Sequence, residues 1–143
     1  MTTVGSERAG PRPEVCVGAV VVDNGRLLLI RRGHGPAAGS WSVPGGRVEW
    51  GEALAAATLR ELAEETGLEG MCDEVLGWVE RIDDSSHLVI VDFRVSVLDP
   101  TDPVPGSDAA EAAWVPLSGV VDLNLVDGLA EFLHEHGILD VIT

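Results

Sequence analysis

The sequence predicts an α/β fold, in which helices cover a sheet. Residues Val15 to Val22 form a nearly continuous run of apolar, mostly β-branched side chains, which is typical of a strand buried on both faces. Residues 52–66 have the spacing of an amphipathic helix and end at Gly67, a common C-cap residue. A second amphipathic helix is expected at about Val126 to His136, where apolar residues recur at helical spacing.

Turn residues divide the rest of the chain into strands and loops. Asp23-Asn24-Gly25 predicts a hairpin that leads into a strand at Arg26 to Ile30. Residues 31–40 and 99–110 are rich in glycine, proline or polar side chains and are expected to be exposed loops. The other expected strands are Met71 to Arg81, His87 to Leu98 and Ala112 to Pro116.

Size and charge restrict the class of protein. A chain of 143 residues that is 45% hydrophobic fits a single domain, expected at 14–143 after a flexible lead-in at 1–13. The lead-in lacks the apolar region of a signal peptide and no long apolar run follows, so we expect a cytoplasmic protein without a membrane span. The net charge of −15 argues against a nucleic-acid polymer as partner. Two cysteines, Cys16 and Cys72, are expected to be buried thiols.

The helix at 52–66 carries an unusual cluster of acids. Glu61, Glu64 and Glu65 share an arc of roughly 100°, whereas Ala55 and Leu62 are expected to face the core side. Like charges at this spacing repel, and two of them lie at the negative end of the helix dipole. A divalent cation would offset the repulsion, since Mg²⁺ and Mn²⁺ prefer oxygen ligands and often bridge carboxylates to substrate phosphates.

Residues near this helix are candidates for contact with the substrate. The turn Pro44-Gly45-Gly46 allows backbone groups to approach a ligand closely. Basic side chains that could hold phosphates precede this turn, at Arg31 and Arg32, and follow it, at Arg47. The aromatic side chain of Trp50, beside the loop that leads into the helix, could stack on a base. A solvated loop is an equally good interpretation of Arg32, and Trp78 and Trp114 are expected to pack in the core.

Read with its spacing, the acidic stretch resembles a known motif. Gly46 is followed after five residues by Glu52, and after seven more by RELAEETGL at 60–68. This resembles the Nudix box, G-x5-E-x7-R-E-U-x-E-E-x-G-U with U apolar, at every specified position. The preceding hairpin, the WSVPGG segment and the EAAWVPL segment are also similar to that family.

The resemblance implies a Nudix-type α/β/α sandwich with a mixed sheet, and a metal-dependent hydrolase of nucleoside diphosphates linked to another group. By position, Glu61, Glu64 and Glu65 would supply oxygens to Mg²⁺ or Mn²⁺, Gly45 would offer its carbonyl, and Arg60 would orient the carboxylates. The supporting positions would be Glu52, as a partner of Arg60, together with Gly46 and Gly67. The general base is either a box glutamate or a loop carboxylate, for which Glu111 is the candidate and Asp108 a weaker substitute.

Substrate choice is poorly marked in the sequence. Chain length and the VDFRV segment resemble the short bacterial ADP-ribose pyrophosphatases and nucleoside triphosphate pyrophosphohydrolases. We expect a small nucleotide substrate of the ADP-ribose type, with oxidised nucleoside triphosphates such as 8-oxo-dGTP as the alternative. Some Nudix-like domains only bind nucleotides, but the intact set of Arg60 and the three glutamates argues for catalysis. The resemblance also allows a homodimer.

Overall fold

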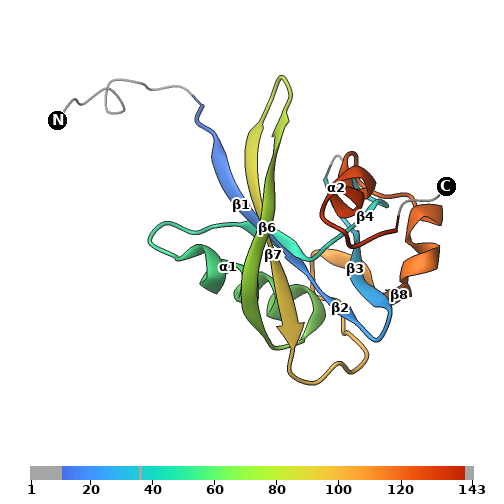
Figure 1. Cartoon of the computed structure of the whole chain (residues 1–143). Helices are drawn as coiled ribbons and strands as arrows, with labels where there is room; N and C mark the ends of the chain where they lie inside the picture. The colour runs from blue at the N-terminus through green and yellow to red at the C-terminus, as the bar shows by residue number, and fades with distance from the viewer. Residues whose placement is uncertain (1–10, 36, 141–143) are drawn as a thin grey trace.

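The computed structural model describes residues 11–35 and 37–140, so most of the expected lead-in at 1–13 falls outside the described residues. A four-stranded sheet runs in the order β5-β1-β7-β6 (Figure 1). Its strands are β1 (Glu14–Val20), β5 (Gly45–Arg47), β6 (Gly70–Ile82) and β7 (His87–Val97). Because β1 is parallel to β7 while the other pairs are antiparallel, the expected mixed sheet is confirmed.

A second, antiparallel sheet is built around β3, which the sequence did not separate from the first. Its strands are β2 (Val22–Asp23), β3 (Arg26–Arg32), β4 (Trp41–Ser42) and β8 (Ala109–Pro116). The hairpin turn between β2 and β3 is confirmed, with Asn24 and Gly25 both at positive φ. The expected end of the loop at 99–110 was wrong, because pairing with β3 extends β8 back to Ala109 and places Glu111 in a strand.

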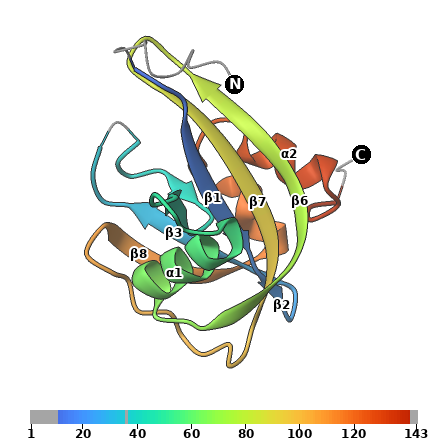
Figure 2. The same ribbon diagram turned by 90° about the vertical axis from the view of Figure 1, so that its left-hand side faces the viewer.

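Helices cover the sheets from both sides. Helix α1 (Leu54–Thr66) and helix α2 (Leu129–Glu135) lie on opposite faces of the β5-β1-β7-β6 sheet, the main sheet, in both views (Figures 1 and 2). A 3₁₀ helix, η2 (Leu117–Asp122), connects β8 to the α2 side. The α/β/α arrangement is confirmed, although α2 is shorter than the helix expected at Val126 to His136.

Helix α1 starts later than its sequence suggested but ends where it was expected. It begins after Ala53, which makes no side-chain capping bond, so Glu52 belongs to the preceding loop. It ends at Gly67, whose φ of 73° is the left-handed conformation that glycine adopts without strain. The expected core face was partly wrong: Leu62 is fully buried, but Ala55 is exposed and Ala57 takes its place.

Two apolar clusters hold the layers together. The cluster under α1 joins the helix to β1 and β7; its fully buried members include Ala19, Val21, Leu28, Ala57 and Leu62. The cluster under α2 joins that helix to β1 and β3; its fully buried members include Val20, Leu27, Leu29, Val120 and Leu133. The continuous apolar run in the first strand therefore serves both clusters, which confirms that it is buried on both faces.

Two packing predictions were wrong and two were confirmed. Trp78 is 64% exposed and lies on β6, the strand at the edge of the main sheet. Cys72 is only half-buried, whereas Cys16 is buried as expected. Trp114 packs against the α1 cluster, with the Arg26 guanidinium 5.3 Å from its ring centroid. Among the described residues, no helix is long and apolar enough to cross a membrane.

Candidate active site

The glycine turn lies directly against α1, so that two box glutamates meet the backbone of β5. The Gly45 N–H donates a hydrogen bond of 2.6 Å to Glu65 Oε1. A Cβ at Gly46 would clash with the Glu61 carboxylate, so glycine here lets that carboxylate lie directly against the β5 backbone. The register Gly45↔Gly18 and Gly46↔Val17 fixes this turn to the edge of the main sheet.

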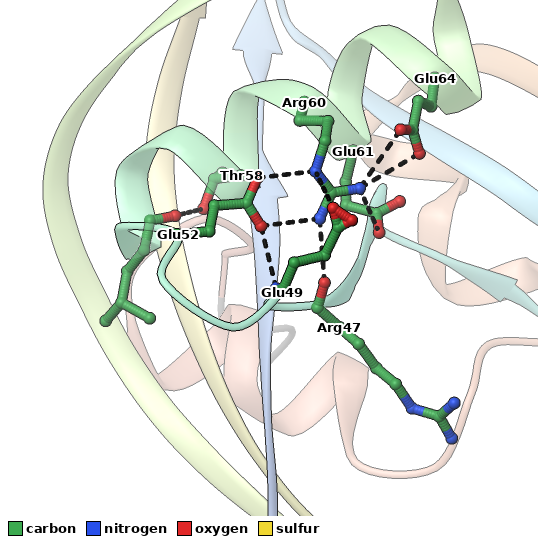
Figure 3. A network of polar contacts seen from close by, with 8 residues as sticks. Arg47, Glu49, Glu52, Thr58, Arg60, Glu61 and Glu64 are labelled. Carbon is green, nitrogen blue, oxygen red and sulfur yellow. Dashed lines mark hydrogen bonds and ion pairs between the residues drawn. The ribbon is translucent and has the colours of Figure 1, made fainter.

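Arg60 organises the acids on the exposed side of the helix (Figure 3). Its guanidinium donates to both oxygens of Glu52, at 2.7 and 2.9 Å, and to the carbonyl of Arg47 at 3.0 Å. It also donates to Glu61 and Glu64, each at 3.3 Å. This confirms the expected pairing of Glu52 with Arg60.

The charge of Glu52 is well compensated where it lies. The hydrogen bonds from Arg60, together with one from the Glu49 N–H at 3.0 Å, lower the pKa of Glu52 to about 2. The same contacts raise the pKa of Arg60 above its usual value. The ion pair between Glu52 and Arg60 therefore compensates the charge of Glu52 and fixes the loop before α1 to the helix.

The charge of Glu65 is poorly compensated. Its side chain is buried, and burial raises its pKa to about 7, with the negative charges of Glu61 and Asp108 adding to the effect. The hydrogen bond from Gly45 acts in the opposite direction but is weaker than the effect of burial. Burial also raises the pKa of Glu61, against the lowering effect of Arg60. The buried Glu65 and the partly buried Glu61 thus lie next to each other without enough positive charge around them.

These residues fit a divalent cation in chemistry and electrostatics. Carboxylate and carbonyl oxygens are the ligands that Mg²⁺ and Mn²⁺ prefer, and a cation would relieve the cost of burying Glu61 and Glu65. Within the described part of the chain, no three His, Cys, Asp or Glu side chains already converge on one point. Glu64 is exposed and held by Arg60, so its side chain would have to turn to join the other two.

The loop between β7 and β8 brings a further carboxylate to the box. The Gly106 N–H donates to the Glu65 carbonyl at 3.2 Å, which fixes this loop to the last turn of α1. Asp108, two residues further, is close enough to raise the pKa of both Glu61 and Glu65. The sequence marked Asp108 only weakly, because nothing local predicts that a loop 40 residues downstream returns to the helix.

The predicted substrate-binding residues lie in different surroundings. Arg31 forms an ion pair of 2.7 Å with Glu111, its neighbour across β3 and β8. Arg32 lies on the box side, since its charge lowers the pKa of Glu65. The Arg47 side chain is largely exposed and pairs with Glu14 at 2.9 Å. The remaining candidate, Trp50, is fully exposed in the loop before α1.

A helix that presents clustered carboxylates beside a glycine turn, on an α/β/α fold, is the arrangement expected of a hydrolase that works with a divalent cation. A family model of the NUDIX domain matches residues 12–136, and the chain belongs to this family. The expected fold, family and hydrolase class are confirmed.

Three relatives show what the chain is similar to. It is 35% identical over 130 residues to an ADP-ribose pyrophosphatase of Methanocaldococcus jannaschii, covering 90% of this chain and 72% of that protein. It is 32% identical to a putative 8-oxo-dGTP diphosphatase of Bacillus subtilis, covering 67% of this chain and 61% of that one. The solved NUDIX domain of Shewanella oneidensis NrtR, complexed with ADP ribose, superposes with a TM-score of 0.77 at 25% identity, covering 96% and 97%.

Proposed function

We propose that this Nudix hydrolase cleaves the pyrophosphate of nucleoside diphosphate derivatives in the presence of Mg²⁺ or Mn²⁺, with ADP-ribose as the leading substrate. The observation that carries the proposal is the pair of carboxylates, the buried Glu65 and the partly buried Glu61, held against the turn at Gly45 and Gly46. Buried acids with too little compensating charge suit a cation better than they suit a purely structural role.

In the proposed reaction, a water oxygen forms a bond to one phosphorus of the pyrophosphate. The bond from that phosphorus to the bridging oxygen breaks, and the water proton passes to a carboxylate. A divalent cation, when bound, would reduce the repulsion between substrate and nucleophile and stabilise the charge that develops. Glu61, Glu65 and, after turning, Glu64 would hold it together with the Gly45 carbonyl, while Arg60 keeps the carboxylates in position.

The proton acceptor is assigned by proximity. The Glu111 carboxylate is held in the ion pair with Arg31, and about half of its side chain is exposed. Asp108 lies close enough to the box for its charge to act on Glu61 and Glu65. We therefore infer that Asp108, rather than Glu111, is the loop carboxylate that orients or deprotonates the water.

The substrate proposal rests on the relatives. The protein from Methanocaldococcus jannaschii is named for ADP-ribose, and a structurally similar NUDIX domain has been solved with ADP ribose bound. Oxidised nucleoside triphosphates are the second candidate, because the relative from Bacillus subtilis is named for 8-oxo-dGTP. Of the four proposed substrate contacts, Arg32 is the best placed to meet phosphates near the box, whereas Arg31 and Arg47 would first have to leave their ion pairs and Trp50 would act from the exposed loop.

The test is a hydrolysis screen with Mg²⁺ over ADP-ribose, other nucleotide sugars, and normal or oxidised deoxynucleoside triphosphates, in which added phosphatase or pyrophosphatase converts the products to inorganic phosphate for detection. We expect the highest kcat/KM for ADP-ribose, with AMP and ribose 5-phosphate as products. Faster turnover of 8-oxo-dGTP would move the assignment to the second candidate. Binding of cation and nucleotide without turnover of any substrate would support a binding module instead.

Three further proposals accompany this function. We propose that residues 14–143 form one domain, because the two apolar clusters share β1 and β3. A cytoplasmic location fits a hydrolase of small nucleotides, and fractionation of the producing cells would test it.

A homodimer is proposed because β6 is a long strand at the sheet edge. Light scattering on the purified chain measures its mass directly.

A further inference from the structure

The loop between β7 and β8, residues 98–108, is fastened to the end of α1 by its backbone. The Val104 N–H donates to the Thr66 carbonyl at 2.8 Å. The Gly106 N–H donates to the Glu65 carbonyl at 3.2 Å. These carbonyls belong to the last turn of the helix, where carbonyls have no partner within the helix itself. The loop therefore completes the end of the helix that carries the box glutamates.

Asp108 lies in a tight turn at the end of this loop. The Ala109 N–H donates to the Gly106 carbonyl at 3.2 Å, which closes a turn with Ser107 and Asp108 at its centre. From the other side, the Gly33 N–H donates to the Asp108 carbonyl at 3.1 Å. The backbone of Asp108 is thus held between two segments, by α1 through Gly106 and by the segment after β3 through Gly33.

Both of these contacts are made by a glycine that has no room for a side chain. A Cβ at Gly106 would overlap the Glu64 carbonyl oxygen, a backbone atom that cannot move without shifting the helix. A Cβ at Gly33 would lie 3.2 Å from the Asp108 carbonyl oxygen and 3.3 Å from the Ala110 nitrogen, a tight contact. Neither glycine has a positive φ, so close approach and not backbone conformation is what glycine allows here.

We propose that Gly106 and Gly33 are positioning residues, which hold the Asp108 carboxyl where it can act on the attacking water. The inference rests on the proposed function, in which Asp108 orients or deprotonates that water. The Asp108 charge already reaches the box, since it raises the pKa of Glu61 and Glu65. A misplacement of about 1 Å can cost about 100-fold in rate, so the spacing that the two glycines set should be visible in kcat.

The test is a double-mutant cycle. Gly106→Ala and Gly33→Ala are each made in the wild type and in Asp108→Asn, so that the cycle isolates the part of each effect that passes through Asp108. Gly119→Ala is the matched control, because a Cβ there meets nothing within 4 Å and its φ is not positive. For the substrate that the wild type hydrolyses best, kcat and KM are measured at saturating Mg²⁺. Apparent Mg²⁺ affinity and thermal unfolding are measured on the same samples.

The two glycine variants should differ in the size of their effect. We expect Gly106→Ala to lower kcat by about 10- to 100-fold, because its Cβ meets a backbone atom, with little change in KM or in Mg²⁺ affinity. Gly33→Ala should lower kcat by less than about tenfold, since a small shift relieves its contact. In Asp108→Asn, neither substitution should lower kcat by more than about twofold further, and Gly119→Ala should match the wild type.

Three results would overturn this inference while the hydrolase function stands. The first is an unchanged kcat in both glycine variants. The second is the same fold loss in Asp108→Asn as in the wild type, above all with weaker Mg²⁺ affinity, because the glycines would then act through the helix and its glutamates. The third is near wild-type kcat in Asp108→Asn itself. If Gly106→Ala does not fold, the cycle with Gly33→Ala decides. Absence of hydrolysis by the wild type on every substrate would instead overturn the proposed function.

Discussion

The region before α1 and the last turns of α1 treat their glutamates in opposite ways. Before the helix, Glu52 accepts two short hydrogen bonds from Arg60, and its pKa falls to about 2. Toward the end of the helix, Glu65 is buried with one hydrogen bond from a backbone N–H, and its pKa rises to about 7. The first carboxylate is balanced by the protein itself, whereas the second is left for something else to balance. The motif contains both, but only their surroundings separate a supporting residue from a proposed cation ligand.

The largest effect is expected from a substitution at Glu65, the carboxylate whose charge the protein does not compensate. Glu65→Gln keeps the size of the side chain and an acceptor for the Gly45 N–H, but removes the charge that would hold a cation. We expect kcat/KM to fall by more than about 100-fold, beyond the 10- to 100-fold typical of residues that only support ligands. Steady-state kinetics at saturating Mg²⁺ measures this, with the exposed Glu69→Gln as matched control. Turnover close to that of the wild type would remove Glu65 from the cation site.

Asp108, on the loop that contacts the last turn of α1, can be compared with Glu111 on β8. We expect Asp108→Asn to lower kcat by about 100-fold, the lower range for loss of a general base. Glu111→Gln should lower kcat by less than about tenfold, because it breaks a partly exposed ion pair. The reverse order of the two variants in parallel pH–rate measurements would return the role of base to Glu111.

A smaller effect is expected at Arg60, which compensates the charge of Glu52. Arg60→Lys keeps the positive charge but replaces a planar group that binds two oxygens of Glu52 at once. We expect kcat/KM to fall by about tenfold, because the carboxylates lose their alignment while the proposed ligands remain. Titration with Mg²⁺ should show a weaker apparent affinity for the metal. An unchanged affinity together with an unchanged rate would show that Glu61 and Glu64 need no such alignment.

The two ends should also differ in how stability depends on pH. The folded protein holds the Glu65 proton more tightly than the unfolded chain, so this group costs stability as pH rises from about 4.5 through 7. Without divalent cations, Glu65→Gln should therefore be more stable than the wild type at pH 8 by roughly 2–3 kcal/mol, and nearly equal at pH 4.5. Urea unfolding in the presence of a chelator measures the difference.

Glu52 supplies the opposite case for the same measurement. Its folded-state pKa is lowered, so its contribution to stability is present above about pH 4.5 and is lost as pH falls toward 2. Glu52→Gln should therefore be less stable than the wild type at pH 8. If both variants shifted the free energy of unfolding in the same direction at pH 8, the contrast between the two ends would be wrong.

Local sequence predicted the elements whose signals are contiguous. The buried first strand, the turn at Asn24-Gly25 and the C-cap at Gly67 were all recognisable, because each depends on a few neighbouring residues. Errors fell where distant segments meet. Glu111 was placed in a loop because pairing with β3, 80 residues away, cannot be read from its neighbours. Trp78 was expected in the core because its strand pattern does not reveal that β6 lies at the edge of the sheet.

By itself, the sequence determined the family and the kind of chemistry, because the spacing of the box along one helix already places its acids together. Tertiary structure decided which acids are balanced by the protein and which are not. That distinction depends on burial and on groups that other segments bring to the helix: Gly45 beside Glu65, and Asp108 on a returning loop. Desolvation and charge proximity act through space, so the order of residues along the chain cannot specify them.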